Sequence, residues 1–437
     1  KGRATVLGDA EAAIRKRQGA QPVGRLAEPV GRADQQQHVA GADLELAEST
    51  QGHIERAFGL YHQAFLDAPQ GPSAIHAKIG EAHTEAYREN RFKEALEAFG
   101  LAAERLTNDQ VPDWDPRRVK LVHYLDVHIQ RELETASYEN ALALLHVVEP
   151  LMGEDGDTTL IHRFAETYRH LGDASLKLAG DLQGQPGDDP HVEARRIHNQ
   201  DAAVYYEQAA RAFRREAVLL EAKADEHGDA LWAAGECFKK AQLWDDAVAV
   251  YQDFLATGGD EARRHEAMFR LGQAFLADGQ FGAARDQFRG LIEASETSEW
   301  AKKAYVPLSR SLVAMDEWDL AEQWLRHVVE DHRAIGPESD FFRDALIELG
   351  GLYYRRGSQD DVFYARAIEV LGDEGGAVER YAMQRDEQKR REDPALGPRL
   401  RYMLADCLRL SAQGLGRQAA QAPNPADRLE MQAERVR

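Results

Sequence analysis

A pair of adjacent residues, of which the second is small, recurs in the middle of the chain at a fixed interval. The pairs Ala234-Gly235, Leu271-Gly272 and Leu308-Ser309 lie 37 residues apart each time. An interval of this length is too short for a domain but long enough for two helices and their turns. A chain with such an interval is therefore expected to stack repeated units, each of which buries its apolar face against its neighbours.

The residues around these pairs repeat as well, with spacings of three and four residues that indicate helices. In the unit that contains Gly272, Met268 and Phe275 flank the pair, and Ala284 and Phe288 follow it. A fourth unit begins in register, although its second helix, "DDVFYARAIEVL", is out of step. Alternating β-branched runs are nearly missing, so we expect an all-α fold. The matching positions of the other units are Leu231, Phe238, Ala247 and Tyr251, then Tyr305, Leu312, Ala321 and Leu325, and finally Leu346, Leu349, Gly350 and Tyr353.

Two antiparallel helices approach closely only where one side chain is very small. We therefore expect Gly235 and Gly272, together with Ala247, Ala284 and Ala321, to lie where the two helices of a unit cross. We call Gly235, Gly272 and Ser309 the notch residues. Their predicted role is packing, not catalysis or the binding of a ligand.

This spacing of large, small, aromatic and alanine positions resembles the tetratricopeptide repeat. The resemblance implies a right-handed α-solenoid of stacked antiparallel helix pairs, in which the first helices line a concave groove. Residues 228–360, and "LIEASETSEWAKKAYVPLSRSLVAMDEWDLAEQWLRHVV" in particular, are similar to repeats of bacterial envelope tetratricopeptide proteins. This second resemblance implies a periplasmic or envelope-associated protein, and a cytoplasmic one stays open.

Four segments are expected along the chain, with about seven to nine helix pairs in all. Residues 1–45 form a loosely ordered or atypical segment, and residues 46–222 form irregular repeat-like pairs with long helices, interrupted by the loop "GDLQGQPGDDP". Residues 228–335 hold the regular repeats, and residues 336–437 hold degenerate repeat-like helices. In the irregular segment the glycines of the first helices are predicted to be lost.

Composition disfavours several classes of function. The formal charge is −21, from 75 acidic and 54 basic residues, so nucleic acid should be repelled and we expect no nucleic-acid partner. No run of 18 apolar residues occurs, so no transmembrane segment is expected, although peripheral association with the envelope stays possible. The two cysteines, Cys237 and Cys407, are too few for a disulfide framework. Because the chain begins at Lys1, a leader or lipid anchor stays open.

The motifs that carry catalysis or bind metals and cofactors are missing. His123 and His128, like His327 and His332, lie five residues apart, a spacing that turns two helical side chains away from each other. The glycines of "GLG" at 414–416 lack the strand that a phosphate-binding loop requires, so a turn is predicted there. We therefore expect no enzyme, no catalytic residue, no metal and no cofactor.

What remains is surface. On the repeat alignment, residues beside the packing positions of the first helices should point into the groove, and aromatic side chains and arginine are common in binding hot spots. Some of the aromatic side chains could instead pack between repeats, and Pro307 should bend its helix. The predicted groove residues are Trp232, Glu236, Lys239, Phe269, Gln273, Leu276, Lys303, Arg310, Val313, Ile347, Tyr354 and Arg355.

These features favour a non-catalytic scaffold or adaptor that binds a protein or peptide partner through its concave groove. One alternative is a structural subunit of a larger assembly, held by extensive helix surfaces. Another is the regulatory region of an enzyme whose catalytic domain lies outside this chain. The groove residues do not match the carboxylate clamp of chaperone-binding relatives, so binding of a chaperone tail is not expected.

Overall fold

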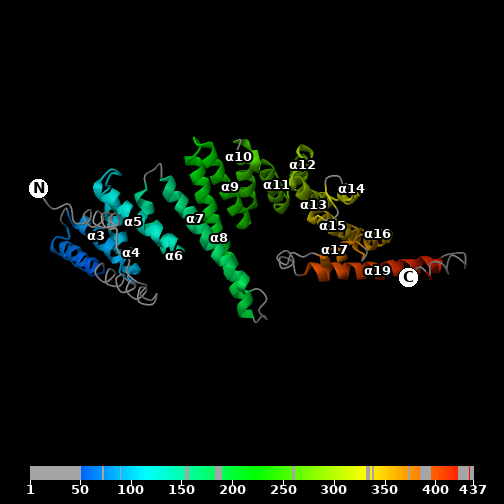
Figure 1. Ribbon diagram of the computed structural model, residues 1–437, viewed down its shortest axis with the longest axis horizontal. Coiled ribbons are helices and arrows are strands. Elements are labelled where there is room, and N and C mark those ends of the chain that lie inside the picture. The colour runs from blue at the N-terminus through cyan, green and yellow to red at the C-terminus, as the bar shows by residue number, and fades with distance from the viewer. Residues whose placement is uncertain are drawn as a thin grey trace, which may run out of the picture. The chain divides into compact units, whose positions relative to one another are not determined.

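The computed structural model describes residues 51–70, 73–88, 90–152, 157–182, 189–257, 261–330, 335–336, 339–372, 375–383, 395–421 and 433. Within these ranges every regular element is a helix (Figure 1). The chain divides into two compact units, residues 1–111 and residues 112–437. This boundary falls inside the predicted segment 46–222. The segment 1–45 lies outside the described residues.

The first unit contains a helix through residues 51–67, followed by α3 (Ala74–Glu85) and α4 (Phe92–Asn108). A Cβ atom on Gly80 of α3 would lie 2.5 Å from Cε1 of Tyr61 in the preceding helix. Gly80 is therefore a notch that admits a tyrosine ring. The prediction that the early first helices lack notch glycines is therefore wrong for α3, where the partner ring lies before the glycine in the chain, although the helix at residues 116–134 contains no glycine, as predicted.

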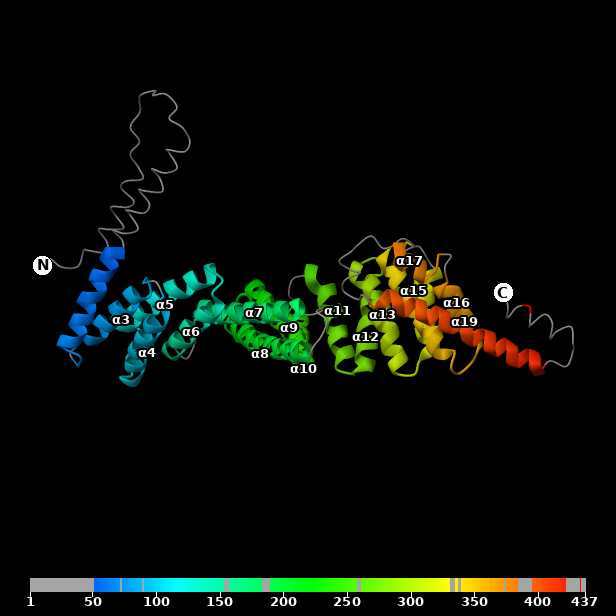
Figure 2. The same ribbon diagram turned by 90° about the horizontal axis from the view of Figure 1, so that it is seen from below.

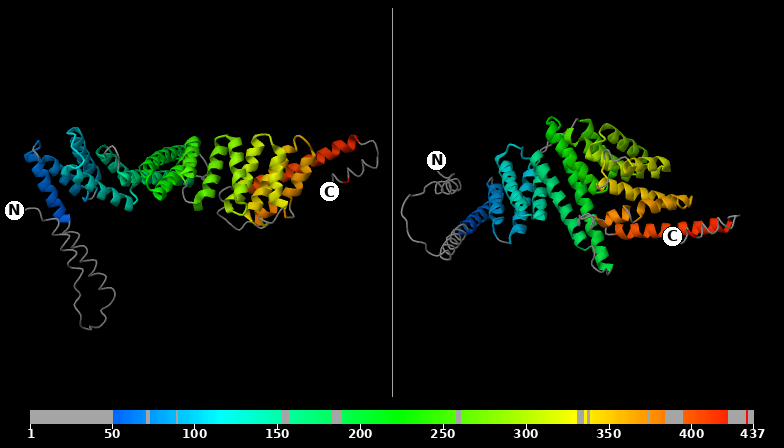
Figure 3. Two further views of the ribbon diagram at one scale, coloured as in Figure 1. Left: turned by 90° about the horizontal axis from the view of Figure 1, so that it is seen from above. Right: turned by 45° about the vertical axis from the view of Figure 1, so that its right-hand side comes forward.

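The second unit consists of antiparallel helix pairs in which consecutive helices pack together. Adjacent first helices also touch, since α11 contacts α13 and α13 contacts α15. The green to yellow helices of this region lie side by side in Figure 3. The helices are α5 (Pro116–Glu134), α6 (Tyr138–Val148), the short 3-10 helix η1 (Glu149–Leu151), α7 (Thr158–Asp181), α8 (Asp189–Leu219), α9 (Ala224–Lys240), α10 (Trp244–Ala256), α11 (Glu261–Ala277), α12 (Phe281–Ala294), α13 (Glu299–Ala314), α14 (Trp318–Glu330), α15 (Asp340–Arg356), α16 (Val362–Leu371), α17 (Ala377–Met383) and α19 (Leu396–Gln421).

The predicted notches are confirmed in the regular repeats. A Cβ atom on Gly235 would lie 2.7 Å from Cε1 of Tyr251, and one on Gly272 would lie 2.6 Å from Cε1 of Phe288. Ser309 and Leu325 are both fully buried at the matching positions. Each second-helix ring thus sits directly over the small residue of the first helix. The predicted crossing alanines are also fully buried, namely Ala247, Ala284 and Ala321.

The turn inside each regular pair also repeats, although its residues differ. Gln242, Gly279 and Asp316 have positive φ angles of 60°, 80° and 65°. In each case the next N–H donates to the carbonyl five residues before it, over 2.9 to 3.0 Å. This is the Schellman arrangement, which ends a helix with one residue in the left-handed region. The backbone therefore keeps the 37-residue period where the sequence does not.

The pair α7–α8 is much longer than its neighbours, with 24 and 31 residues. Figure 1 shows α8 continuing beyond the ends of α9 and α10. Its notch is Gly172, where a Cβ atom would lie 2.8 Å from Cε1 of Tyr206. The extension presents apolar side chains to solvent, which are Leu176, Leu178, Val192 and Ile197.

The C-terminal helices keep the notch but change its partner. The Cβ position of Gly350 on α15 is occupied by the side chain of Leu371 at the end of α16, which explains why α16 is out of step in the sequence. Figure 2 shows α19 lying along α15 and α16, which it contacts. Residues 414–416 belong to α19, so the turn predicted there is wrong. Gly414 instead lets α19 approach Asp361, which accepts a bond of 2.8 Å from Arg417. Pro307 lies inside α13, which continues through it.

Candidate functional site

The residue that follows the notch residue recurs on one face of the first helices α7, α9, α11 and α13, which is the face predicted to line the groove. In α7, α9 and α13 the residue directly after the notch residue contacts the next first helix, and in α11 this residue is Gln273. We call these residues the post-notch positions, and they are Asp173, Glu236, Gln273 and Arg310. Three of them were predicted to face a partner in the groove. The structure shows that the charged ones already hold neighbouring repeats together.

Glu236 contacts three other side chains at such a position. Its carboxylate accepts hydrogen bonds of 2.7 Å from the Tyr251 hydroxyl and 2.7 Å from Lys239. Nε of Arg270, on the next first helix, lies 3.5 Å from the same carboxylate. Burial raises the pKa of Glu236, but the hydrogen bonds and the nearby guanidinium outweigh burial and leave the pKa below its usual range. The carboxylate is therefore charged at neutral pH and joins α9, α10 and α11.

Asp173 repeats this arrangement one pair earlier. It accepts a hydrogen bond of 2.6 Å from the Tyr206 hydroxyl and one of 2.7 Å from Lys240 on α9. In both pairs the ring over the notch carries a hydroxyl, and the residue after the notch is an acid that accepts from it. In the next pair the ring is Phe288, which has no hydroxyl, and the post-notch residue is the uncharged Gln273.

Arg310 reverses the charges of the link. Its Nε donates to Glu348 on α15 over 2.9 Å, and Arg355 lies 3.5 Å from the other oxygen of that carboxylate. Glu348 is buried, whereas the side chains of Arg310 and Arg355 are 59% and 47% exposed. Two exposed guanidinium groups thus share one buried carboxylate, which leaves positive charge and unused N–H donors on the surface.

The aromatic residues predicted for the groove lie in three different environments. Phe269 is a correction, because its side chain is only 7% exposed and its ring centroid lies 5.4 Å from that of Trp300. Its large apolar ring packs between repeats. Trp232 is half-buried, with its centroid 5.5 Å from that of Phe254. Tyr354 is half-buried and donates to Asp406 on α19 over 3.0 Å.

The remaining predicted groove residues are at least partly accessible. Nζ of Lys303 lies 4.2 Å from the centroid of the Trp300 ring and 2.6 Å from Glu299. Lys239 bonds to Glu236 on its own helix, as above. The apolar members pack partly against the core, and they are Leu276, Val313 and Ile347.

The histidine pairs do not form a metal site in the part of the chain that the structure describes. No group of three or more histidine, cysteine or acidic side chains there could hold an ion. His123 is exposed and His128 is buried, so the two rings face different environments. His332 lies outside the described residues. Cys237 and Cys407 are both buried, and burial raises their pKa values to about 12 and about 11. Among the described helices none is long and apolar enough to cross a bilayer.

Clefts open on the other side of the helix pairs, between successive second helices. One of about 450 Å³ lies between α12 and α14, and one of about 480 Å³ lies between α14 and α16. Two more flank α8, with volumes of about 200 and 340 Å³. Sequence reasoning did not single out these second-helix surfaces, because their exposed residues follow no packing pattern.

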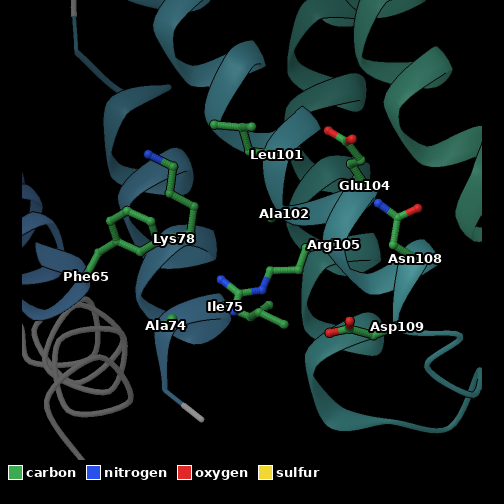
Figure 4. Close-up of a pocket in the computed structure, with 10 residues that line it drawn as sticks. All are labelled: Phe65, Ala74, Ile75, Lys78, Leu101, Ala102, Glu104, Arg105, Asn108 and Asp109. Carbon is green, nitrogen blue, oxygen red and sulfur yellow. The ribbon is translucent and has the colours of Figure 1, made fainter. Parts of the chain in front are cut away.

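A further cleft of about 390 Å³ belongs to the first unit, between the helix 51–67, α3 and α4 (Figure 4). Nζ of Lys78 lies 5.1 Å from the centroid of the Phe65 ring on one side. On the other side Arg105 donates to the Pro69 carbonyl over 3.0 Å. Both cations of this cleft are thus held by the protein itself.

Notch, crossing alanine and Schellman turn recur together in successive antiparallel pairs. The chain has a tetratricopeptide-repeat fold. No family model matches the sequence, and no curated protein does. The assignment of the fold rests on the geometry of the chain's own helix pairs.

Several solved structures with tetratricopeptide repeats are similar to the chain. A STAND ATPase with a tetratricopeptide-repeat sensor from Pyrococcus horikoshii is 13% identical, with a TM-score of 0.32 over 73% of this chain. This chain spans 54%, about half, of that protein. The TPR2AB domain of yeast Sti1, in complex with pHSP90, is 19% identical, with a TM-score of 0.22 over 68% of this chain and 99% of its own. The P58(IPK) TPR domain is 14% identical, with a TM-score of 0.25 over 87% of this chain and 99% of its own.

Proposed function

We propose that the protein is a non-catalytic scaffold that binds a protein or peptide partner along the face of its first helices α9, α11, α13 and α15. One observation carries this proposal. Arg310 and Arg355 share the single carboxylate of Glu348 and are still about half exposed. Each guanidinium has five N–H donors, so both keep donors for an acceptor of a partner. Lys303 lies seven residues before Arg310, on the same side of α13, whereas the buried Phe269 does not contribute.

The contacts between successive first helices also support the proposal. Because Glu236 and Glu348 tie successive first helices together, the side chains between them are held in a fixed arrangement. A preformed surface loses less conformational entropy when a partner binds. Arginine and aromatic side chains on such a surface are typical of binding hot spots.

The test is capture of partners from a lysate of the source organism by the immobilised protein, compared between two variants. Arg310→Ala with Arg355→Ala removes the exposed pair of the first-helix face. Arg289→Ala with Arg326→Ala removes the same charge from the second-helix face, where these side chains are 50% and 48% exposed. Proteins that bind the proposed surface should be lost from the first variant and kept by the second. Identical sets of captured proteins for both variants would contradict the proposal.

A second candidate, a structural subunit of a larger assembly, is favoured by the extension of α7–α8. The large apolar side chains Leu176, Leu178 and Ile197 are 41%, 51% and 44% exposed there, whereas the small Ser175 and Ala179 are buried. An apolar surface of this kind is buried when subunits assemble. A stoichiometric complex that survives high salt in gel filtration would establish this role, and a monomer would exclude it.

We also propose association with a bacterial envelope, on the resemblance of residues 228–360 alone. Fractionation of cells that produce the full reading frame tests this proposal. Recovery in the soluble cytoplasmic fraction would contradict it.

A further inference from the structure

A row of arginines lies along the exposed side of α8. Arg211, Arg214 and Arg215 are all exposed, and their spacings of three and four residues place them on one side of the helix. We call these three residues the arginine ridge. These residues place three positive charges close together on a chain whose formal charge is −21.

The ridge is only partly neutralised by its own protein. Arg211 lies 2.6 Å from Glu207 on the same helix, and Arg214 lies 3.8 Å from Asp246 on α10, a loose pair. In the described part of the chain Arg215 has neither a hydrogen bond nor an ion pair. Glu207 and Asp246, the acids paired with the ridge, are themselves partly exposed, so the ridge keeps positive charge for another anion.

An aromatic wall stands beside the ridge. A cleft of about 200 Å³ is lined by Arg211 and Arg215 together with His146, Phe164 and Tyr168 from α6 and α7. The ring centroids of His146 and Phe164 lie 5.6 Å apart, and those of Phe164 and Tyr168 lie 6.2 Å apart. The cleft is large enough for part of one aromatic or aliphatic side chain. The same two arginines also line the cleft of about 340 Å³ on the other side of α8.

We propose that this side of α8 is a docking surface for an acidic protein segment that carries an aromatic side chain. The carboxylates of the segment bind the guanidinium groups of the ridge, a pairing that forms short, charge-assisted hydrogen bonds. The aromatic side chain enters the cleft beside Phe164 and Tyr168, where ring faces pack against each other. Arginine and tyrosine together have the composition of an interaction hot spot.

A protein segment fits this surface better than a nucleic acid does. Glu207, Asp246 and Glu149 lie on or beside the ridge and its clefts, where a continuous run of phosphates would meet them. The formal charge of −21 adds to that repulsion. A peptide can place its few acidic groups at the arginines and its apolar group at the wall. This surface lies on second helix α8 and does not include the first-helix residues of the proposed function, so either proposal can fail alone.

The test uses a fluorescein-labelled peptide whose only acidic residues are two glutamates on each side of one central phenylalanine, and its binding to the full chain is followed by fluorescence anisotropy. Arg211→Gln with Arg215→Gln should weaken binding about tenfold, because two charge-assisted contacts are lost. The matched control is Arg195→Gln with Arg196→Gln, which removes the same charge from the same helix outside the ridge. The control should change the affinity less than about twofold, because this salt-screened charge lies beyond the contact. Circular dichroism of both variants verifies that the helices are intact.

Two changes of probe complete the design. Replacing the phenylalanine of the peptide by serine should weaken binding about fivefold if the aromatic cleft takes part, since an apolar side chain is no longer buried. A labelled oligouridine should bind more weakly than the peptide at the same salt concentration. Equal binding of the peptide to the wild-type protein and the ridge variant would overturn the proposal. Tighter binding of the oligouridine would overturn it in favour of nucleic acid.

Discussion

The pairs α9–α10 and α7–α8 make the same contact between a notch glycine and an aromatic ring. The number of residues between the glycine and the ring, however, differs greatly between the two pairs. In α9–α10, Gly235 and its ring, Tyr251, are 16 residues apart, whereas Gly172 and Tyr206 in α7–α8 are 34 residues apart. In both pairs the hydroxyl of the ring bonds to the acid after the notch, Glu236 or Asp173. The difference shows that helix packing can be conserved in geometry while the spacing in the sequence changes. A repeat is visible in sequence only where the connecting chain keeps its length.

The largest effect is expected where a notch is filled completely. Gly272→Leu should destabilise the regular repeats by about 3 kcal/mol, because the new side chain must displace the Phe288 ring, and overpacking of a tight core costs this much. The measurement is the urea midpoint followed by circular dichroism at 222 nm, a wavelength that reports helix content in any protein.

The matched control is Gly290→Ala on α12, where nothing lies within 4 Å of the added Cβ. It should stabilise by about 0.5 to 1 kcal/mol, since alanine is the better helix former. A Gly272→Leu variant as stable as the wild type would show that this glycine is not a packing notch.

The second prediction tests whether the long pair uses the notch as the regular pairs do. Gly172→Ala should destabilise by about 1 kcal/mol, because the gain in helix propensity is smaller than the cost of moving the Tyr206 ring. Gly180→Ala on the same helix has open space and should stabilise instead. Opposite signs of the two changes in urea unfolding would confirm that the spacing of 34 residues hides the same contact. Equal signs would break the comparison.

The sequence was informative about packing and less informative about binding. Gly235, Gly272 and Ala284 could be predicted because small residues recur at one interval and serve one physical purpose. Glu236 was predicted to face a ligand, because alignment shows which way a side chain points but not what it meets. Its partner Arg270 lies 34 residues later on the next first helix, and a search for opposite charges at that distance could have found the contact.

The turns show a second limit of sequence reasoning. The glycine at position 279 indicates a left-handed backbone conformation in the sequence itself, since glycine adopts a positive φ without strain. Gln242 takes the same conformation without any such signal, and Asp316 takes it with only the weaker preference of aspartate for positive φ. Tertiary packing of the two helices imposes the turn there, and the local sequence only tolerates it. Residue type therefore could not predict the turn in every repeat.

The third prediction concerns the hydroxyl of the ring that packs on the notch residue. Tyr206 and Tyr251 have this hydroxyl, whereas Phe288 lacks it. Tyr251→Phe should destabilise by about 1 kcal/mol at neutral pH, the typical net contribution of one intramolecular hydrogen bond. The pKa of Glu236 is lower in the folded protein than its ordinary value of 4.5. The stability that the carboxylate contributes is therefore fully present above a pH of about 4.5, and it is lost as the pH falls through the pKa of the folded state. The difference between wild type and variant should therefore shrink in acid.

The control for this prediction is the same change in a Glu236→Gln background, where no carboxylate titrates. There the difference should not depend on pH between neutral and acidic conditions. A pH-dependent difference that persists in this background would assign the effect to another group.

The smallest effects are expected in the turns. There Gly279 and Gln242 occupy equivalent positions of two regular repeats and can be compared directly. Gly279→Ala should destabilise by about 1 kcal/mol, because alanine at a φ of 80° is strained. Gln242→Gly should stabilise by about 0.5 kcal/mol, since glycine relieves the left-handed strain at the equivalent position and its greater freedom in the unfolded chain offsets only part of the gain. Urea unfolding of the two single variants and of the double variant measures both terms. Because the two turns lie in separate repeats, their effects should add. A Gln242→Gly variant that is destabilised as strongly as Gly279→Ala would mean that the glutamine side chain, and not the backbone turn, holds α9 against α10.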